Sequence, residues 1–375
     1  MKSNHKTLFY LFAVILSFVF SCKKNNSSDE NRLKKEYTLE DVSQRLNLKS
    51  KKHYFSQLKR PMRIILKGDY LVIGEHNRID PSNPPVHIID TKNWEYVGEK
   101  GVIGFGPGEI TDAYMLDVGN EKDSFWVYSA TEKRFSEFFL NDTIKLSENQ
   151  IKQEGSFYMA ISMVWSSDST VMCRMANDPN RFVEFNINGD RINEYGDWTN
   201  VSVPGKLTNY MMCDLHLSRL NSNNNKGLFV AAGVKRDRLE ILDKRNEEII
   251  VVNGPVNRLP SFHFTKGVNG ASTALIMDRD EPYKYRDVFV GDKFIYALYC
   301  GRTNKEINST GINSTEVFVF DLKGNVICEL NLDRSLQNLV VDEVNKKLYG
   351  LTTDKDPGIA EFDFPFNKIT PVTGS

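Results

Sequence analysis

The chain has 375 residues, of which 40% are hydrophobic and 26% are charged, and its formal net charge is −1 at pH 7. This composition supplies enough apolar side chains for a sizeable core, which argues against extensive disorder and against repeated membrane spans. The length does not fix the number of domains, because a single closed all-β unit can hold well over about 200 residues.

The N-terminal residues have the pattern of an export signal. Two lysines precede the apolar run of residues 8–20, and Ser21 and Cys22 follow it. A positively charged start, a short apolar run and a small residue before the cleavage point are typical of a signal peptide, which we predict over residues 1–21. A permanent transmembrane helix is the weaker interpretation, because it needs about 20 apolar residues.

Residues 19–22, with the sequence Val-Phe-Ser-Cys, resemble the lipobox of bacterial lipoproteins. The resemblance implies that Cys22 is diacylated and becomes the N-terminus of the mature chain, which would attach the protein to a membrane. Two acyl chains anchor a protein stably, whereas one is marginal. The alternatives are a plain signal peptide or an uncleaved anchor in which Cys22 has no role.

Residues 22–60 contain eleven Lys or Arg and five Asp or Glu, and we predict that they form a basic polar tether beside the anionic membrane surface. A merely solvated linker is the simpler alternative. This segment carries six net positive charges and the leader carries two, so the total of −1 leaves about −9 for residues 61–375. A body of this charge argues against nucleic-acid binding.

Four further cysteines carry no metal-binding pattern. Cys173, Cys213, Cys300 and Cys328 have no CxxC spacing and no neighbouring histidine pattern, so we expect no zinc site. Export to an oxidising compartment permits disulfides, for which four cysteines allow three pairings. Each cysteine also lies in an apolar, strand-like run, so buried free thiols are equally compatible with the sequence.

A repeat of about 50 residues occurs six times along the chain. Each unit has an apolar, β-branched or aromatic run that follows a turn, at residues 69–73, 123–127, 168–172, 226–230, 292–296 and 346–350. A second run follows and ends in Asp or Asn, at residues 86–90, 136–141, 183–186, 239–243, 317–321 and 359–363. With one run before and one after this pair, each unit has four predicted strands.

Four-stranded units in series predict an all-β fold, a six-bladed β-propeller with four antiparallel strands per blade over residues 61–375. A twisted blade cannot bury both faces alone, whereas radial packing of six blades buries them. Two packed β-sandwiches are the competing architecture. The longest interval between units indicates an insertion at about residues 255–284, and the innermost strands are expected near residues 62, 110, 159, 210, 286 and 337.

Residues 101–109, Gly-Val-Ile-Gly-Phe-Gly-Pro-Gly-Glu, match a glycine-rich turn that follows an early blade in one family. Together with the repeat they resemble the TolB-like six-bladed β-propeller lipoproteins of Gram-negative bacteria, over about residues 60–370. The resemblance implies a body anchored by lipid to the outer membrane, periplasmic or surface-exposed, and it says almost nothing about activity. The glycine run is not expected to hold phosphate, because Pro107 removes an amide and residues 110–116 continue as a strand.

The predicted long loops gather on one face of the propeller. Strand direction alternates within a blade, so loops between second and third strands and loops between blades emerge on the same side. The longest predicted loops, residues 74–85, 174–181, 255–284 and 301–315, all belong there. Loops on a rigid scaffold are common binding sites, so we expect a non-catalytic binding or scaffolding protein that uses this face.

The expected ligand is a protein or an acidic molecule. Against a body of about −9, the loops of this face are mildly basic, although charged turns on any soluble propeller are the simpler explanation. The expected contacts are a basic rim of Arg134, Arg174, Arg181, Lys235, Arg236, Arg238 and Arg302, together with the insertion residues Phe262, His263 and Phe264.

The alternative function is a propeller enzyme, a metal-dependent lactonase-like hydrolase or a lyase, with its site in the central channel. Neither a G-x-S-x-G nor an H-E-x-x-H motif is present. Ligands would have to converge from several inner strands within about 5 Å of one point, and the candidates are Asp112, Asp117, Asp214, His216, Asp287 and Asp342. The only cofactor considered is Ca²⁺ at the acidic turns 278–281 or 354–358, neither of which completes a known calcium loop.

Overall fold

The computed structural model describes residues 33–76, 82–203, 205–266 and 272–369. Contacts among Cα atoms separate residues 35–375 as one compact unit, and the fold is that of this second unit. The predicted signal peptide and Cys22 lie outside the described residues.

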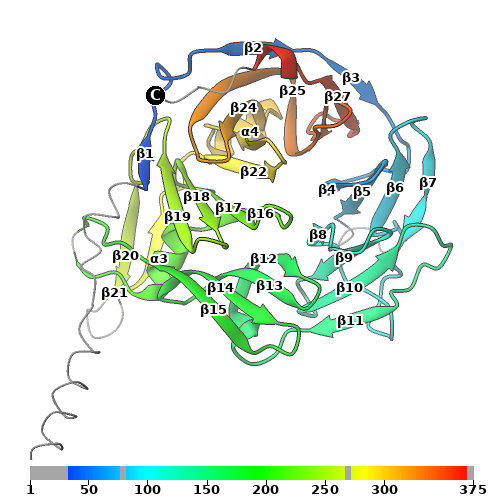
Figure 1. Cartoon of the computed structure of the whole chain (residues 1–375), viewed down its shortest axis with the longest axis horizontal. Helices are drawn as coiled ribbons and strands as arrows, with labels where there is room; N and C mark the ends of the chain where they lie inside the picture. The colour runs from blue at the N-terminus through cyan, green and yellow to red at the C-terminus, as the bar shows by residue number, and fades with distance from the viewer. Residues whose placement is uncertain (1–32, 77–81, 204, 267–271, 370–375) are drawn as a thin grey trace, which may run out of the picture. The chain divides into compact units, whose positions relative to one another are not determined.

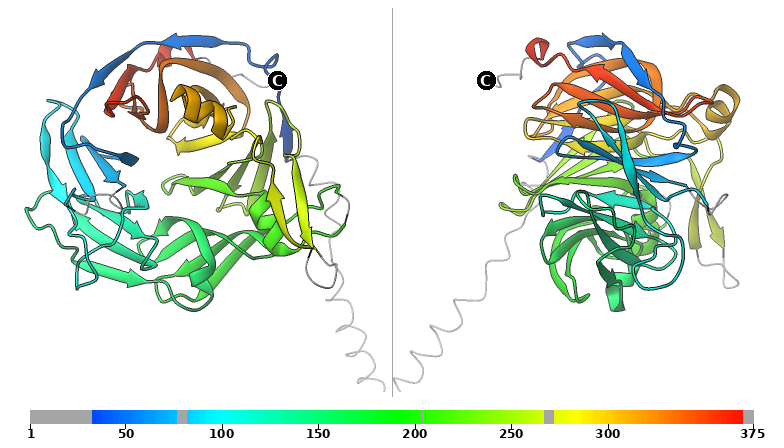
Figure 2. Two further views of the ribbon diagram at one scale, coloured as in Figure 1. Left: turned by 180° about the vertical axis from the view of Figure 1, so that it is seen from behind. Right: turned by 90° about the vertical axis from the view of Figure 1, so that its right-hand side faces the viewer.

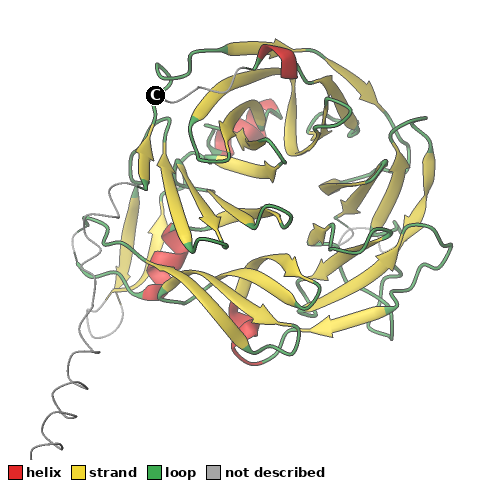
Figure 3. Cartoon of the chain, viewed as in Figure 1, coloured by secondary structure: helices red, strands yellow, loops and turns green. Residues whose placement is uncertain are grey.

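The second unit is a ring of six blades around a central channel (Figure 1), and nearly all its regular structure is β-strand (Figure 3). This arrangement confirms the all-β, six-bladed propeller. Blade 1 is β4 (Pro61–Lys67), β5 (Tyr70–Glu75), β6 (Val86–Asp90) and β7 (Tyr96–Lys100). Blade 2 is β8 (Met115–Asp117), β9 (Ser124–Ser129), β10 (Arg134–Phe139) and β11 (Asn149–Lys152).

The next two blades have the same antiparallel order. Blade 3 is β12 (Ala160–Ser167), β13 (Thr170–Met175), β14 (Asn180–Asn186) and β15 (Arg191–Asp197). Blade 4 is β16 (Ser218–Asn223), β17 (Leu228–Gly233), β18 (Arg238–Asp243) and β19 (Glu248–Asn253).

Blades 5 and 6 share one long strand, β25 (Val326–Asp342). Its first part pairs with β24 as the outer strand of blade 5, and its last part pairs with β26 as the inner strand of blade 6. The remaining strands are β22 (Tyr285–Val290), β23 (Phe294–Tyr299) and β24 (Ser314–Asp321) in blade 5, and β26 (Lys347–Thr352) and β27 (Ile359–Asp363) in blade 6.

The sequence of each middle strand reflects its double burial. All six residues of β17 and of β23 are buried, because a blade packs against a neighbour on each side. The outer strand β15 is instead almost wholly exposed and polar. Tight turns at Gly189 and Gly324 have φ of 87° and 78°, values that glycine adopts without a steric penalty.

An apolar cluster lies at each of the six interfaces between neighbouring blades. In the described residues the cluster between blades 3 and 4 is the smallest of these, with seven buried side chains. A blade therefore buries its two faces only when both neighbours are present. Representative pairs from facing blades, in order from blades 1 and 2 to blades 6 and 1, are Val72 and Phe125, Tyr128 and Val171, Met172 and Phe229, Val230 and Val288, Leu298 and Leu339, and Tyr349 and Leu71.

The chain segment before blade 1 closes the ring. We call residues 35–53 the N-terminal strap. It includes β2 (Arg45–Leu48), which pairs with β25 in parallel, and β3 (Ser50–His53), which pairs with β27 and supplies the fourth strand of blade 6. The short strand β1 (Lys34–Glu36) lies next to β19, so the strap follows the outer edges of blades 4, 5 and 6 (Figure 1).

Buried side chains fix the N-terminal strap to the blades. Tyr37 is 5% exposed, and its ring packs edge-on against Phe318 and Phe320. Its hydroxyl lies 2.9 Å from that of Tyr285, which donates to the Gly254 carbonyl. The segment predicted as a tether, residues 22–60, thus contributes to the propeller from residue 35 onward.

Two helices and one hairpin are added to the four-stranded blades. They lie on the side of the ring that the sequence analysis predicts for the long loops. Helix α3 (Asn209–Leu215) connects blades 3 and 4, and the hairpin of β20 (Phe262–Lys266) and β21 (Ser272–Met277) connects blades 4 and 5. Helix α4 (Asn304–Thr310) joins β23 to β24. We call the side that carries them the elaborated face; α4 and the hairpin project from it in the right panel of Figure 2.

Two blade starts differ from the sequence-based positions. The inner strand expected near residue 210 begins at Ser218, because residues 209–215 form α3, whose N-cap Thr208 accepts from the Met211 amide. The strand expected near residue 110 begins at Met115, and Ile110 makes only an isolated bridge with Ile103.

The short 3₁₀ helices are Gly155–Met159 and Phe366–Lys368. No helix in the described residues is long and apolar enough to cross a membrane.

We predict that removal of the N-terminal strap opens the propeller. A chain that starts at residue 54 lacks β3 and the buried side chains of Val42 and Leu48, whose burial contributes about 3–6 kcal/mol in total. Its melting temperature should fall sharply relative to a chain that starts at residue 33, as measured by circular dichroism. Equal melting temperatures for the two chains would show that the strap does not close the ring.

Candidate functional site

The structure brings three of the predicted rim arginines together in the protein interior. Arg174, Arg181 and Arg238 are 5%, 6% and 8% exposed and surround Glu240 of β18. Nη1 of Arg174 lies 2.6 Å from the Glu240 carboxylate, Nη2 of Arg238 lies 2.8 Å from it, and Nε of Arg181 lies 3.9 Å from it. These arginines stabilise the interface of blades 3 and 4 and do not form an exposed rim.

Helix α3 covers this cluster on the elaborated face. His216, the C-cap residue of α3, is 5% exposed and stacks on Trp198, with ring centroids 4.8 Å apart. Its Nε2 lies 3.1 Å from Nη1 of the half-buried Arg236. The Arg174 guanidinium lies over the other partner of the stack, 5.0 Å from the Trp198 ring.

Burial and charge shift the pKa values of this cluster strongly. Burial opposes ionisation of Glu240, but the guanidinium groups of Arg174, Arg238 and Arg181 outweigh it and hold its pKa well below the usual range. Burial, reinforced by Arg238, lowers the pKa of His216 well below its usual value. A neutral His216 can accept the hydrogen bond from Arg236, which agrees with the short distance between them.

The other three predicted rim arginines, Arg134, Arg236 and Arg302, are half-buried and bonded locally, Arg236 to His216 as described above. Arg134 donates to Gln150 and pairs with Glu132 at 3.4 Å. Arg302 donates to the carbonyls of Cys300 and Asn313. The basic rim is therefore not a single exposed patch.

The insertion residues divide between two faces of the β20–β21 hairpin. Phe262 and Phe264 pack with Leu275 and Met277 against α3, in a small apolar cluster. His263 and Ile276, which pair with each other across the hairpin, face outward, with the His263 side chain 64% exposed. Of the three predicted contacts His263 is the exposed one, whereas Phe262 and Phe264 are half-buried and hold the hairpin in place.

One carboxylate in each of the acidic turns considered for Ca²⁺ pairs with basic side chains. Asp354 pairs with Lys52 at 2.8 Å and with Arg334 at 2.9 Å. Glu281 pairs with Arg258 at 2.9 Å. All four cysteines of the body, Cys173, Cys213, Cys300 and Cys328, are buried free thiols.

The six polar candidates for a channel enzyme do not converge. Asp117 and Asp287 line the central channel, whereas Asp214 and His216 belong to α3 and its cap. Asp112 accepts from the backbone amides of Ala130 and Thr131, and Asp342 accepts from the backbone of the turn after β25. In the part of the chain that the structure describes, no group of three or more His, Cys, Asp or Glu side chains could hold a metal ion.

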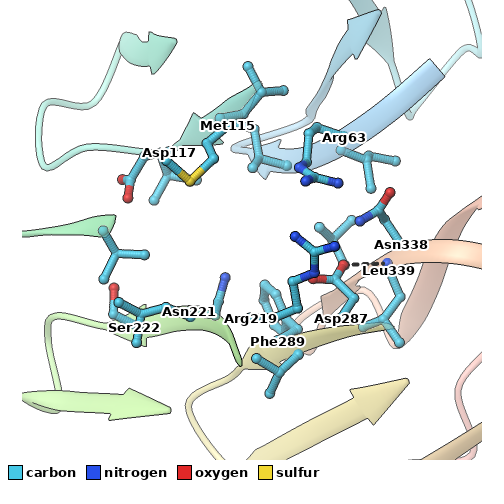
Figure 4. Close-up of a pocket in the computed structure, with 18 of the residues that line it drawn as sticks. Arg63, Met115, Asp117, Arg219, Asn221, Ser222, Asp287, Phe289, Asn338 and Leu339 are labelled. Carbon is cyan, nitrogen blue, oxygen red and sulfur yellow. Dashed lines mark hydrogen bonds between the residues drawn. The ribbon is translucent and has the colours of Figure 1, made fainter. Parts of the chain in front are cut away.

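The central channel contains a cavity of about 130 Å³ that the inner strands of all six blades line. Arg63 of β4, Arg219 of β16 and Asp287 of β22 lie close together in it, with Asn338 of β25 beside them (Figure 4). Asp117 of β8 lies on another part of the wall. The guanidinium groups of Arg63 and Arg219 point into the same part of the cavity (Figure 4).

Sequence reasoning missed both arginines of the channel. Arg63 stands in a predicted inner strand, and Arg219 stands in the strand that was expected to begin at residue 210. Only the alternation of side chains along an inner strand could have indicated that they face the channel, and this alternation depends on strand boundaries and bulges. A bulge does occur between Pro61 and Arg63.

We predict that replacing Glu240 by Gln destabilises the protein at neutral pH. Three buried guanidinium groups would lose their counterion, and breaking a buried ion pair costs about 3–5 kcal/mol. Because the pKa of Glu240 is lower in the folded than in the unfolded chain, its contribution is complete above about pH 4.3 and is lost as the pH falls further. The difference in the free energy of unfolding between the wild type and the Glu240→Gln variant should therefore become smaller at acidic pH.

Urea unfolding at pH 7 and at acidic pH measures both effects. Glu248→Gln, at an exposed position on β19 of the same blade, is the matched control and should change stability little. A Glu240→Gln variant as stable as this control would contradict the assignment.

Comparisons with known proteins agree with the six-bladed propeller fold described above. The family described as TolB-like 6-blade propeller-like matches residues 38–344. A member of the DUF4221 family from Bacteroides vulgatus superposes with a TM-score of 0.53 at 13% identity, over 87% of this chain and 99% of that one. A Bacteroides fragilis protein, described as a "putative exported protein", gives a TM-score of 0.52 at 13% identity, over 88% of this chain and 98% of that one.

At these identities the two structures show a shared fold and nothing about activity. A search of curated proteins finds no match. The family match covers most of the chain and includes the N-terminal strap from residue 38 as well as five complete blades. The chain therefore belongs to the TolB-like six-bladed propeller family.

Proposed function

We propose that this chain is an extracytoplasmic binding or scaffolding lipoprotein, anchored to the outer membrane through Cys22, whose elaborated face holds a protein or an acidic ligand. The observation that carries the proposal is the placement of the additions: α3, the β20–β21 hairpin and α4 all emerge on one side of a rigid ring. Binding residues are commonly carried on loops that a rigid scaffold positions.

The hairpin is built to present a surface. Its inner side chains are used for packing against α3, and Arg258 and Glu281 pair at its base. Lys235 adds a contact to the Glu281 carbonyl and lies 3.8 Å from the centre of the Tyr283 ring. These contacts fix the hairpin, so its outward residues can bind a partner with little loss of conformational entropy.

Export supports the same proposal. The signal sequence predicts transport across the inner membrane, and a protein with a similar fold is described as exported. An enzyme in the channel has no comparable support, because its candidate ligands do not converge in the described residues.

We predict that Cys22→Ala releases the protein from the membrane fraction. The variant lacks the thiol that would carry the acyl chains, and acylation by two chains provides stable attachment. Fractionation of cells that express the full chain, followed by immunoblotting, measures the distribution. Full retention of the variant in the membrane fraction would rule out lipid anchoring at Cys22.

We predict that the double change His263→Ser and Ile276→Ser weakens partner recovery without loss of stability. Both side chains face outward, and Ile276 is 43% exposed, so little packing is lost. The readout is the amount of each protein cross-linked to the full-length chain in the native cell envelope. The control is Val344→Ser, which removes an 87% exposed side chain from the turn after β25 on the opposite face. Equal recovery by both variants would place the binding surface elsewhere.

A further inference from the structure

The channel holds two arginines that lack sufficient counter-charge. Arg63 uses Nε to donate to the Tyr114 carbonyl at 3.0 Å and Nη1 to donate to the Met62 carbonyl at 2.9 Å. Arg219 makes no hydrogen bond or ion pair with its side chain in the described part of the chain, and its Nε is buried. A buried guanidinium nitrogen without an acceptor is costly.

The nearby carboxylates do not supply the missing partner. Asp287 accepts from the Leu339 amide at 3.0 Å and lies beyond ion-pair distance of both arginines in the described residues. Burial raises its pKa, and the charges of Arg63 and Arg219 offset this only in part. Asp117 accepts from the amides of Gly119 and Trp165 at 2.7 and 3.0 Å. Arg63, Arg219 and Asp287 therefore leave one net positive charge at their end of the cavity.

The arginines also repel each other. Burial, followed by the charge of Arg219, lowers the pKa of Arg63 to about 10, although Asp287 acts in the opposite direction. An anion between the two guanidinium groups would relieve this repulsion and supply acceptors for the free N–H groups.

A buried polar atom without a hydrogen-bond partner also lies beside the arginines. Asn338 is 4% exposed and lines the cavity, and its Oδ1 is buried without a donor. A hydroxyl group on a bound molecule could donate to it. The cavity of about 130 Å³ is larger than the space that one water molecule needs, so it can hold a bound molecule.

We propose that the central channel binds a small oxyanion, a carboxylate or a phosphate that also carries a hydroxyl group, between Arg63 and Arg219 and beside Asn338. The planar guanidinium groups match the two oxygens of a carboxylate or phosphate. This site is independent of the elaborated face, since it lies on the inner strands of the ring.

Isothermal titration of the full-length protein with malate, succinate and inorganic phosphate, at equal ionic strength, tests the proposal. Malate should bind more tightly than succinate, which lacks the hydroxyl group, and the phosphate titration decides between the two oxyanion classes. Arg219→Gln should weaken the tightest of these interactions by at least about tenfold, which corresponds to 1.4 kcal/mol. Arg219→Lys keeps the positive charge without the planar guanidinium group, so it should lose less affinity than Arg219→Gln does.

The control is Arg245→Gln, which removes one exposed guanidinium group from the turn after β18 and should bind as the wild type does.

Without added anion, Arg219→Gln should melt no lower than the wild type, because a repulsive contact is removed. Absence of binding by all three probes, or equal loss in the Arg219→Gln and Arg245→Gln variants, would overturn the proposal. Either result leaves partner recovery by the elaborated face unaffected, so the two proposals fail separately.

Discussion

The fold depends on the apolar packing between neighbouring blades. Each blade is a thin sheet with two apolar faces, and a middle strand such as β17 is buried on both. No blade can be removed from the ring without exposing two such faces to water. Closure is therefore as important as the blades themselves, and the N-terminal strap supplies it by adding β3 to blade 6 and by burying Tyr37, Val42 and Leu48 against blades 4 and 5.

Charged side chains lie inside the ring in two places, and they are paired with an opposite charge in only one of them. Between blades 3 and 4, where the apolar cluster is smallest, Glu240 neutralises part of the charge of three arginines and fixes how the two blades meet. In the channel, Arg219 has no such partner within the described residues. A paired buried charge is a structural element, whereas an unpaired one at the edge of a cavity is typical of a ligand site.

The rigid ring also explains how the chain can vary one face without disturbing the rest. Loops between the second and third strands and between blades emerge on one side of the ring, so α3, α4 and the β20–β21 hairpin can be added there. The hairpin brings its own small core with it, because Phe262 and Phe264 pack on α3 rather than on a blade. The additions are thus anchored to one another as well as to the scaffold.

The sequence by itself determined the export signal pattern, the number of blades and the face that carries the long loops, because each of these follows from local periodicity and from strand direction. Tertiary structure alone decided the role of residues 35–53, whose strands β2 and β3 have only four residues each and pair because blades 5 and 6 offer them free edges. It also decided which arginines are buried. Arg174 and Arg238 belong to a rim by sequence, but the approach of blades 3 and 4 encloses them around Glu240, and only ring closure brings Arg63 and Arg219 into one channel.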